Sequence, residues 1–92
     1  MGPQDYVAER KDEILSELVA FASIPSVSTD SAYAEHLKAG AEWVADRMRR
    51  AGLENVRINP TEGHPIVTCD WLHAAGAPTI LIYGHYDVQP PD

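Results

Sequence analysis

The order of periodic segments in the sequence predicts an α/β fold, with two N-terminal helices packed on a mixed β-sheet. Two long segments repeat apolar residues at helical spacing, and three shorter segments rich in β-branched residues follow them. The last of these contains the uninterrupted apolar run Ile80-Leu81-Ile82, which is typical of a strand buried on both faces. This arrangement favours one layer of a larger α/β sandwich.

Composition limits the classes of function. The 92 residues include 14 acidic and 7 basic side chains, so the surface repels phosphate backbones and anionic lipids. We therefore expect neither nucleic acid nor a membrane as a partner. Cys69 is the only cysteine, which excludes an internal disulfide and a zinc-thiolate cluster. The chain begins without a signal peptide, and no apolar run reaches the ~18 residues of a membrane span, so we expect a cytoplasmic protein.

The first predicted helix covers residues 5–22. Its apolar residues recur near helical spacing, with charged residues between them. We expect Asp5 to cap its N-terminus. The helix must end before Pro25, because the residue preceding a proline is driven out of the helical region. The polar segment after it, residues 24–31, is predicted to be a loop whose serines and Asp30 cap the next helix, or else to line a substrate cleft.

The second predicted helix covers residues 32–51 and ends at Gly52, which suits the position after a helix C-terminus. Trp43 lies off its main apolar stripe, so we expect this ring to pack against a neighbouring element. The stripe itself recurs at intervals of three or four residues and consists of Tyr33, Leu37, Ala41, Val44 and Met48.

Three strands are predicted after Gly52, at residues 56–59, 66–72 and 79–82. The loop of residues 74–78 is short, so we expect the second and third strands to be antiparallel neighbours.

The third strand leads into the candidate site, Gly84-His85-Tyr86-Asp87. If the backbone stays extended past Gly84, the side chains of His85 and Asp87 point to the same side. A histidine that binds a metal through one ring nitrogen needs a partner for its other N–H, and a carboxylate two residues on can supply it. On spacing alone, a simple loop hydrogen bond remains the alternative. His64 and His73 are weaker candidates as further ligands, since neither has a partner at ligand spacing.

Residues 82–90, Ile-Tyr-Gly-His-Tyr-Asp-Val-Gln-Pro, resemble the first metal-binding motif of the M20 family of zinc metallopeptidases and aminoacylases. The Val-Gln-Pro continuation is most similar to the dipeptidase branch that includes carnosinase and non-specific cytosolic dipeptidase. Upstream, residues 21–28 resemble the segment that ends a helix in the same family. The resemblance therefore runs from the first helix to the last residue.

The resemblance implies roles for two residues. His85 matches the first zinc ligand of the family, and Asp87 matches the catalytic aspartate that orients it. The family pattern further implies two zinc ions bridged by a carboxylate and a water, and a glutamate that activates this water to hydrolyse the amide bond of dipeptides or short peptides. Members generally carry a second domain that mediates homodimerisation.

The remaining zinc ligands and the general base of the family have no match in this sequence. The resemblance therefore implies that residues 1–92 are the N-terminal portion of a catalytic domain, without its remainder or dimerisation domain, and inactive on their own. Two other interpretations stay open. One is a non-catalytic binding module or pseudoenzyme that keeps the fold without the metal site, and the other is an unrelated small α/β interaction domain.

Overall fold

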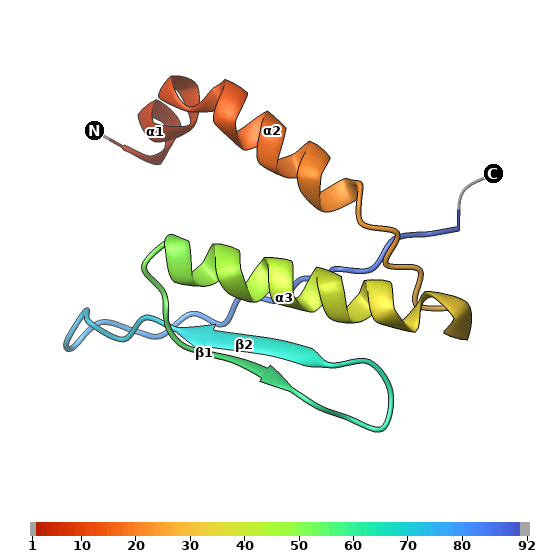
Figure 1. The fold of residues 1–92 in the computed structure, drawn as a ribbon. Coiled ribbons are helices and arrows are strands. Elements are labelled where there is room, and N and C mark those ends of the chain that lie inside the picture. The colour runs from red at the N-terminus through yellow and green to blue at the C-terminus, as the bar shows by residue number, and fades with distance from the viewer. Residues whose placement is uncertain (1, 91–92) are drawn as a thin grey trace.

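The computed structural model describes residues 2–90 and has the predicted mixed α/β character (Figure 1). Its elements are helices α1 (Pro3–Glu9), α2 (Lys11–Ala22), η1 (a 3-10 turn, Ser31–Tyr33) and α3 (Ala34–Arg50), followed by strands β1 (Glu54–Asn59) and β2 (Ile66–Asp70). Within the described residues, no helix is both long and apolar enough to cross a membrane.

The first predicted helix is divided into α1 and α2 at Arg10, which is a correction to the sequence prediction. Arg10 leaves helical geometry at φ −117° and ψ 22°, and its guanidinium lies 4.2 Å from the centre of the Tyr6 ring. No proline or glycine marks this break. Asp5 is not the N-cap either. The helix begins earlier, at Pro3, whose fixed φ suits a first helical position, and the Asp5 carboxylate accepts from Gly2 N at 3.0 Å.

The start of η1, which leads directly into α3, and the end of α3 follow from local chemistry that the sequence contains. Asp30 precedes η1, and its carboxylate accepts a hydrogen bond from Ala32 N at 2.9 Å. At the other end, Gly52 has φ 89°, a left-handed conformation that glycine adopts readily. Gly52 N then donates to Arg49 O and Leu53 N to Met48 O, which satisfies two carbonyls of the last turn.

The two strands form an antiparallel pair in which Ile58 faces Val67. The register is irregular between Glu54 and Arg57, where Asn55 takes a positive φ of 53°. Asparagine tolerates this conformation better than most residues, and the Asn55 amide is held by the Asp70 carboxylate at 3.1 Å. Local side-chain bonding therefore stabilises the irregular end of the sheet.

Helix α3 lies between α2 and the two strands (Figure 1). Two side-chain pairs join α2 to α3. The Arg47 guanidinium donates to the Glu17 carboxylate at 2.9 Å, and the Phe21 and Trp43 rings lie 5.2 Å apart between centroids. The expectation that Trp43 packs against a neighbouring element is confirmed. Both helices were expected to lie directly on the sheet. In the structure α3 lies on the strands, and α2 contacts α3 through these two pairs.

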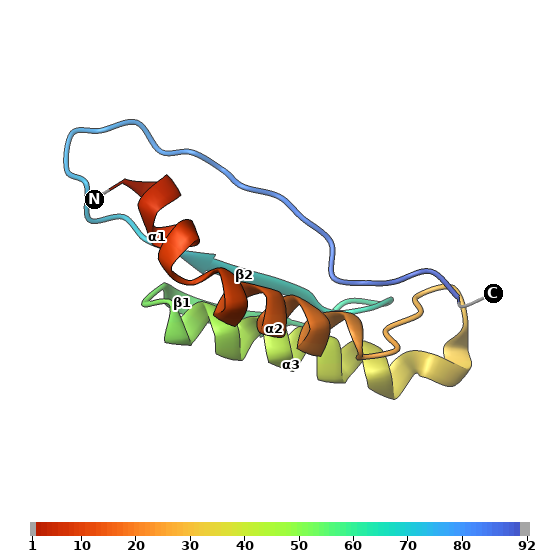
Figure 2. The same cartoon turned by 90° about the horizontal axis from the view of Figure 1, so that it is seen from above.

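The third predicted strand does not form in the described residues. Residues 79–83 run as extended chain apart from β2, which they were expected to pair with (Figure 2). The side chains of Ile80 and Leu81 are 82% and 93% exposed. An apolar run favours a strand only where a sheet edge and a covering layer receive it, and residues 2–90 supply neither at this place.

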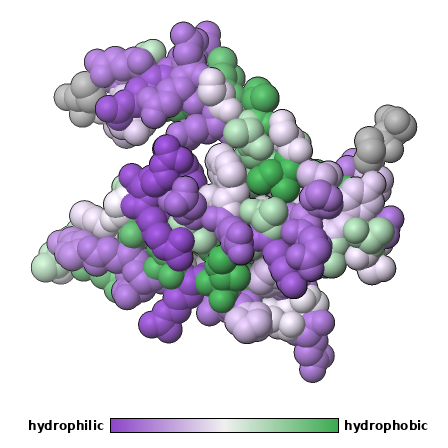
Figure 3. Space-filling view, in the orientation of Figure 1, coloured by the Kyte–Doolittle hydropathy of each residue, from purple (hydrophilic) through white to green (hydrophobic). Residues whose placement is uncertain are grey.

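The buried core is small and lies along α3. Its members are nearly inaccessible to solvent: Ser26, Val27, Leu37, Ala41 and Ala45. Helices α1 and α2 bury no side chain fully, and Figure 3 shows apolar patches along α2 within a largely hydrophilic surface. The apolar stripe predicted for this region is present in the sequence, but Leu18 and Val19 on it remain exposed.

We expect the 92-residue chain on its own to bind a hydrophobic dye strongly, because residues 80–83 and the stripe on α2 leave apolar surface open to solvent. Replacing Ile80 and Leu81 together by serine should lower the dye fluorescence, whereas Ala8→Ser on α1 should not. A chain that unfolds in one cooperative thermal transition and binds no dye would contradict this expectation.

Candidate metal centre

His85 and Asp87 form a hydrogen-bonded pair, as their spacing predicted. His85 Nδ1 lies 2.9 Å from Asp87 Oδ1. A charged carboxylate can only accept, so Nδ1 must carry the hydrogen. In the neutral imidazole the lone pair then lies on Nε2. The His85 side chain is 76% exposed and that of Asp87 38%, so the ring is open to a ligand from solvent.

The second carboxylate oxygen of Asp87 is held by Ser28. The Ser28 hydroxyl donates to Asp87 Oδ2 at 2.5 Å, across 59 residues of sequence. This bond is the main cause that lowers the pKa of Asp87 below its usual value, with partial burial opposing it and His85 adding to it. Asp87 is therefore a carboxylate at neutral pH, and both of its oxygens have a fixed partner.

Backbone pairing brings the segment of residues 26–28 to the segment of residues 86–88. Val27 and Val88 form an isolated parallel bridge, and Val88 N donates to Ser26 O at 2.9 Å. The Ser26 hydroxyl also donates to Tyr86 O at 3.0 Å. This pairing fixes the backbone on both sides of Asp87.

Tyr86 anchors the same segment to α3 and to the loop before β2. Its hydroxyl donates to Pro65 O at 2.6 Å. Its ring lies against Gly40, where an added Cβ would stand 3.3 Å from Tyr86 Cδ2. Burial, with a smaller effect from the charge of Asp87, raises the pKa of the Tyr86 hydroxyl, which therefore remains a donor at neutral pH. At Gly84, which begins the candidate site, an added Cβ would meet nothing within 4 Å.

The two weaker histidine candidates lie in different surroundings. His73 Nε2 lies 2.7 Å from a carboxylate oxygen of Glu54. His64 Nε2 lies 2.9 Å from Ser28 O, and since a carbonyl only accepts, the ring nitrogen donates. Among residues 2–90, no three histidine, cysteine or acidic side chains stand close enough together to hold a metal ion.

Sequence reasoning missed the contact of Ser28 with the site. Residues 24–31 were assigned mainly to loop and capping roles, and Asp30 does cap η1. The available signal was the resemblance itself, since the same family pattern covered residues 21–28 and residues 82–90. The two segments lie on either side of a helix and two strands in the sequence and can meet in the folded chain. Their spacing in the sequence does not show which of their side chains are in contact.

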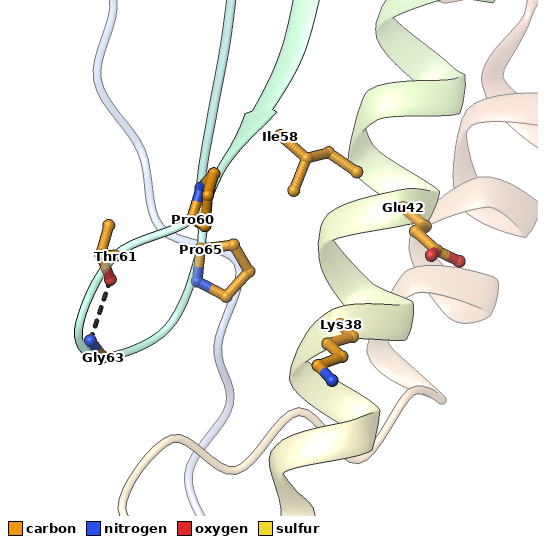
Figure 4. Close-up of a pocket in the computed structure, with 7 residues that line it drawn as sticks. All are labelled: Lys38, Glu42, Ile58, Pro60, Thr61, Gly63 and Pro65. Atoms are coloured by element: carbon orange, nitrogen blue, oxygen red, sulfur yellow. Dashed lines mark hydrogen bonds between the residues drawn. The ribbon is translucent and has the colours of Figure 1, made fainter.

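An open hollow of about 450 Å³ lies between α3 and the turn that joins β1 to β2 (Figure 4). Lys38 and Glu42 line it from the helix, and Pro65 from the turn, in which Gly63 N donates to the Thr61 hydroxyl. His85 and Asp87 do not line this hollow. The hollow is therefore separate from the candidate metal centre.

We expect Ser28→Ala to raise the pKa of Asp87 toward its usual value, because the hydroxyl stabilises the charged carboxylate. In the wild type, the pKa of Asp87 is lower in the folded state than its ordinary value, so the charged carboxylate stabilises the fold at pH values above that ordinary pKa. This stabilisation is lost as the pH falls through the lowered pKa. Carbon-13 NMR titration of the Asp87 carboxyl group measures the change. Ser23→Ala serves as the control, since the Ser23 hydroxyl donates to Val19 O instead. Equal Asp87 pKa values in Ser28→Ala and wild type would contradict the assignment.

Comparison with known proteins gives four related dipeptidases. The Cys-Gly metallodipeptidase of Candida albicans is 28% identical over 94% of this chain and 20% of its own length, and that of Schizosaccharomyces pombe is also 28% identical, with the same coverage. The cysteinylglycine-S-conjugate dipeptidase of Corynebacterium striatum is 32% identical over 89% of this chain and 17% of its own length. No protein-family model and no solved structure matches the chain significantly.

The fold and the His–Asp pair define an α/β segment with a candidate metal ligand. The resemblance seen in the sequence is confirmed at the level of metallodipeptidases, to which the chain is homologous along nearly its whole length. The chain spans about a fifth of the length of the curated relatives it matches.

Proposed function

We propose that residues 1–92 are the N-terminal portion of the catalytic domain of an M20-type zinc metallopeptidase that hydrolyses dipeptides or short peptides. The observation that carries the proposal is the His85–Asp87 pair, whose 2.9 Å bond directs Nε2 to solvent in a chain homologous to metallodipeptidases. The relatives named for Cys-Gly and cysteinylglycine conjugates make a dipeptide the preferred substrate class.

The residues present suit one corner of a zinc site. An imidazole nitrogen is a common zinc ligand, and a ligating histidine almost always donates its other N–H to a carboxylate or carbonyl. His85 would hold the zinc through Nε2, and Asp87 would fix the ring orientation and raise the basicity of that nitrogen. When bound, a pair of zinc ions would supply Lewis-acid polarisation of the amide carbonyl and an acidified water.

We propose that the remaining ligands and the general base belong to a part of the catalytic domain outside residues 1–92. The exposed apolar run of residues 80–83 supports this, since such a run becomes a stable strand when a further sheet edge covers it. On this proposal residues 1–92 alone are inactive. A homodimeric full-length protein and a cytoplasmic location remain predictions from the sequence.

Hydrolysis of a dipeptide panel that includes Cys-Gly tests the function of the full-length protein. We expect turnover that a chelator removes and added zinc restores, while residues 1–92 alone show none. Turnover that survives complete metal removal would contradict the metallopeptidase assignment. The absence of turnover of any peptide would favour the non-catalytic binding module.

A further inference from the structure

We propose that Ser28 is a positioning residue for the metal ligand: it holds the Asp87 carboxylate so that His85 presents Nε2 to a metal. This inference rests on the proposed function. The chain of contacts runs from the Ser28 hydroxyl to Asp87 Oδ2 at 2.5 Å, and from Asp87 Oδ1 to His85 Nδ1 at 2.9 Å.

The carboxylate needs such a partner because its terminal torsion is loosely determined. The χ2 angle of aspartate is broad, so one hydrogen bond to an exposed histidine does not fix the plane of the group. The His85 side chain is 76% exposed and is held to the described residues through this carboxylate. A second bond on the other oxygen fixes the carboxylate plane, and the plane in turn sets the direction of the imidazole N–H.

Ser28 is itself placed from both sides. His64 Nε2 donates to the Ser28 carbonyl at 2.9 Å, and the preceding residues pair with Val88 through the Val27–Val88 bridge and the Ser26 carbonyl. Because these bonds fix the backbone at residues 26–28, the Ser28 hydroxyl stays directed at Asp87.

The alternative for Ser28 is a capping role in the loop before η1. A capping serine bonds to backbone groups within a few residues of itself. The Ser28 hydroxyl bonds instead to a side chain 59 residues away, and Asp30 supplies the cap of η1. The contacts therefore give the two residues different roles: Asp30 caps η1, and Ser28 holds a carboxylate of the candidate metal centre.

Zinc affinity of the full-length apo-protein, measured by competition with a chromophoric chelator, tests the inference. Loss of an outer partner of a metal ligand typically lowers metal affinity about 10–100-fold. We expect Ser28→Ala to lower zinc affinity about 10-fold, at the lower end of that range, because the Asp87 carboxylate is still present but no longer held in one orientation toward His85. Ser28→Thr keeps the hydroxyl and should restore most of the affinity, and the control Ser23→Ala should bind zinc as the wild type does.

A second readout reports on the imidazole directly. Nitrogen-15 NMR of His85 in the metal-free full-length protein should report the Nδ1–H tautomer in the wild type and in Ser28→Thr, and a tautomer mixture in Ser28→Ala. If Ser28→Ala does not fold, Ser28→Cys replaces it, since a thiol has nearly the same shape and is a weaker donor. Wild-type zinc affinity and an unchanged tautomer in the variant that folds would overturn the inference.

His85→Ala distinguishes this failure from failure of the proposed function. If His85→Ala binds zinc as the wild type does, the metal centre is elsewhere and both proposals are overturned. If His85→Ala loses zinc while Ser28→Ala keeps wild-type affinity, only the positioning role of Ser28 is overturned.

Discussion

Replacing His85 with alanine should lower dipeptide hydrolysis by the full-length protein at least about 100-fold at limiting zinc, since removing even an outer partner of a ligand costs about 10–100-fold. The substitution removes Nε2, the nitrogen that the bond from Nδ1 to Asp87 leaves free for a metal. Steady-state rates measured across a zinc titration give the effect, and excess zinc should restore part of the lost activity if the other ligands remain.

His73→Ala is the matched control for this substitution. His73 also pairs with a carboxylate, Glu54, at 2.7 Å, but not with Asp87 or Ser28. We expect its activity and zinc requirement to equal those of the wild type. A His85→Ala protein with near wild-type activity at limiting zinc would remove His85 from the metal centre.

Leu37→Ala should destabilise the full-length protein by about 2–5 kcal/mol, the usual range for a buried leucine reduced to alanine. The Leu37 side chain is 1% exposed and is one of the few fully buried side chains along α3. The cavity would form three residues from Gly40, against which the Tyr86 ring packs, so the loss would loosen the support of the candidate metal centre. Urea denaturation gives the change in the free energy of unfolding.

Leu18→Ala on α2 provides the comparison, because the Leu18 side chain remains exposed in the described residues. We expect a change within about 0.5 kcal/mol, as for an ordinary surface substitution. A larger loss in Leu18→Ala than in Leu37→Ala would contradict the assignment of the core to α3, and would indicate that a further part of the protein covers α2.

Local chemistry made much of the fold predictable. Asp30 caps η1, which leads directly into α3, and Gly52 follows the end of α3, as the sequence predicted. The alternation around Ile58 predicted β1. The break at Arg10 was not predictable, since the residue carries no conformational signal. The prediction of a strand at residues 79–82 was wrong for a different reason. Apolar content measures a preference for burial, while strand formation also depends on a partner edge.

The candidate site likewise has one contact that the sequence predicted and one that it did not. The spacing of His85 and Asp87 predicted their hydrogen bond, because two residues of extended chain bring side chains to one side. The contact from Ser28 depends on the parallel bridge between Val27 and Val88, which forms only when the chain folds back over α3 and the strands. Long-range pairing of this kind leaves no periodic trace in the sequence, so it emerged from the structure.

A crystal structure of the full-length protein grown with zinc, with anomalous differences recorded on both sides of the zinc absorption edge, tests the central claim most directly. We expect a zinc peak at about 2.0–2.1 Å from His85 Nε2, the usual distance for a histidine ligand. His85 Nδ1 should still be bonded to Asp87, and the Ser28 hydroxyl to the other oxygen of that carboxylate. Zinc bound without His85, or coordinated with Asp87 turned away from the imidazole, would contradict the proposed metal centre.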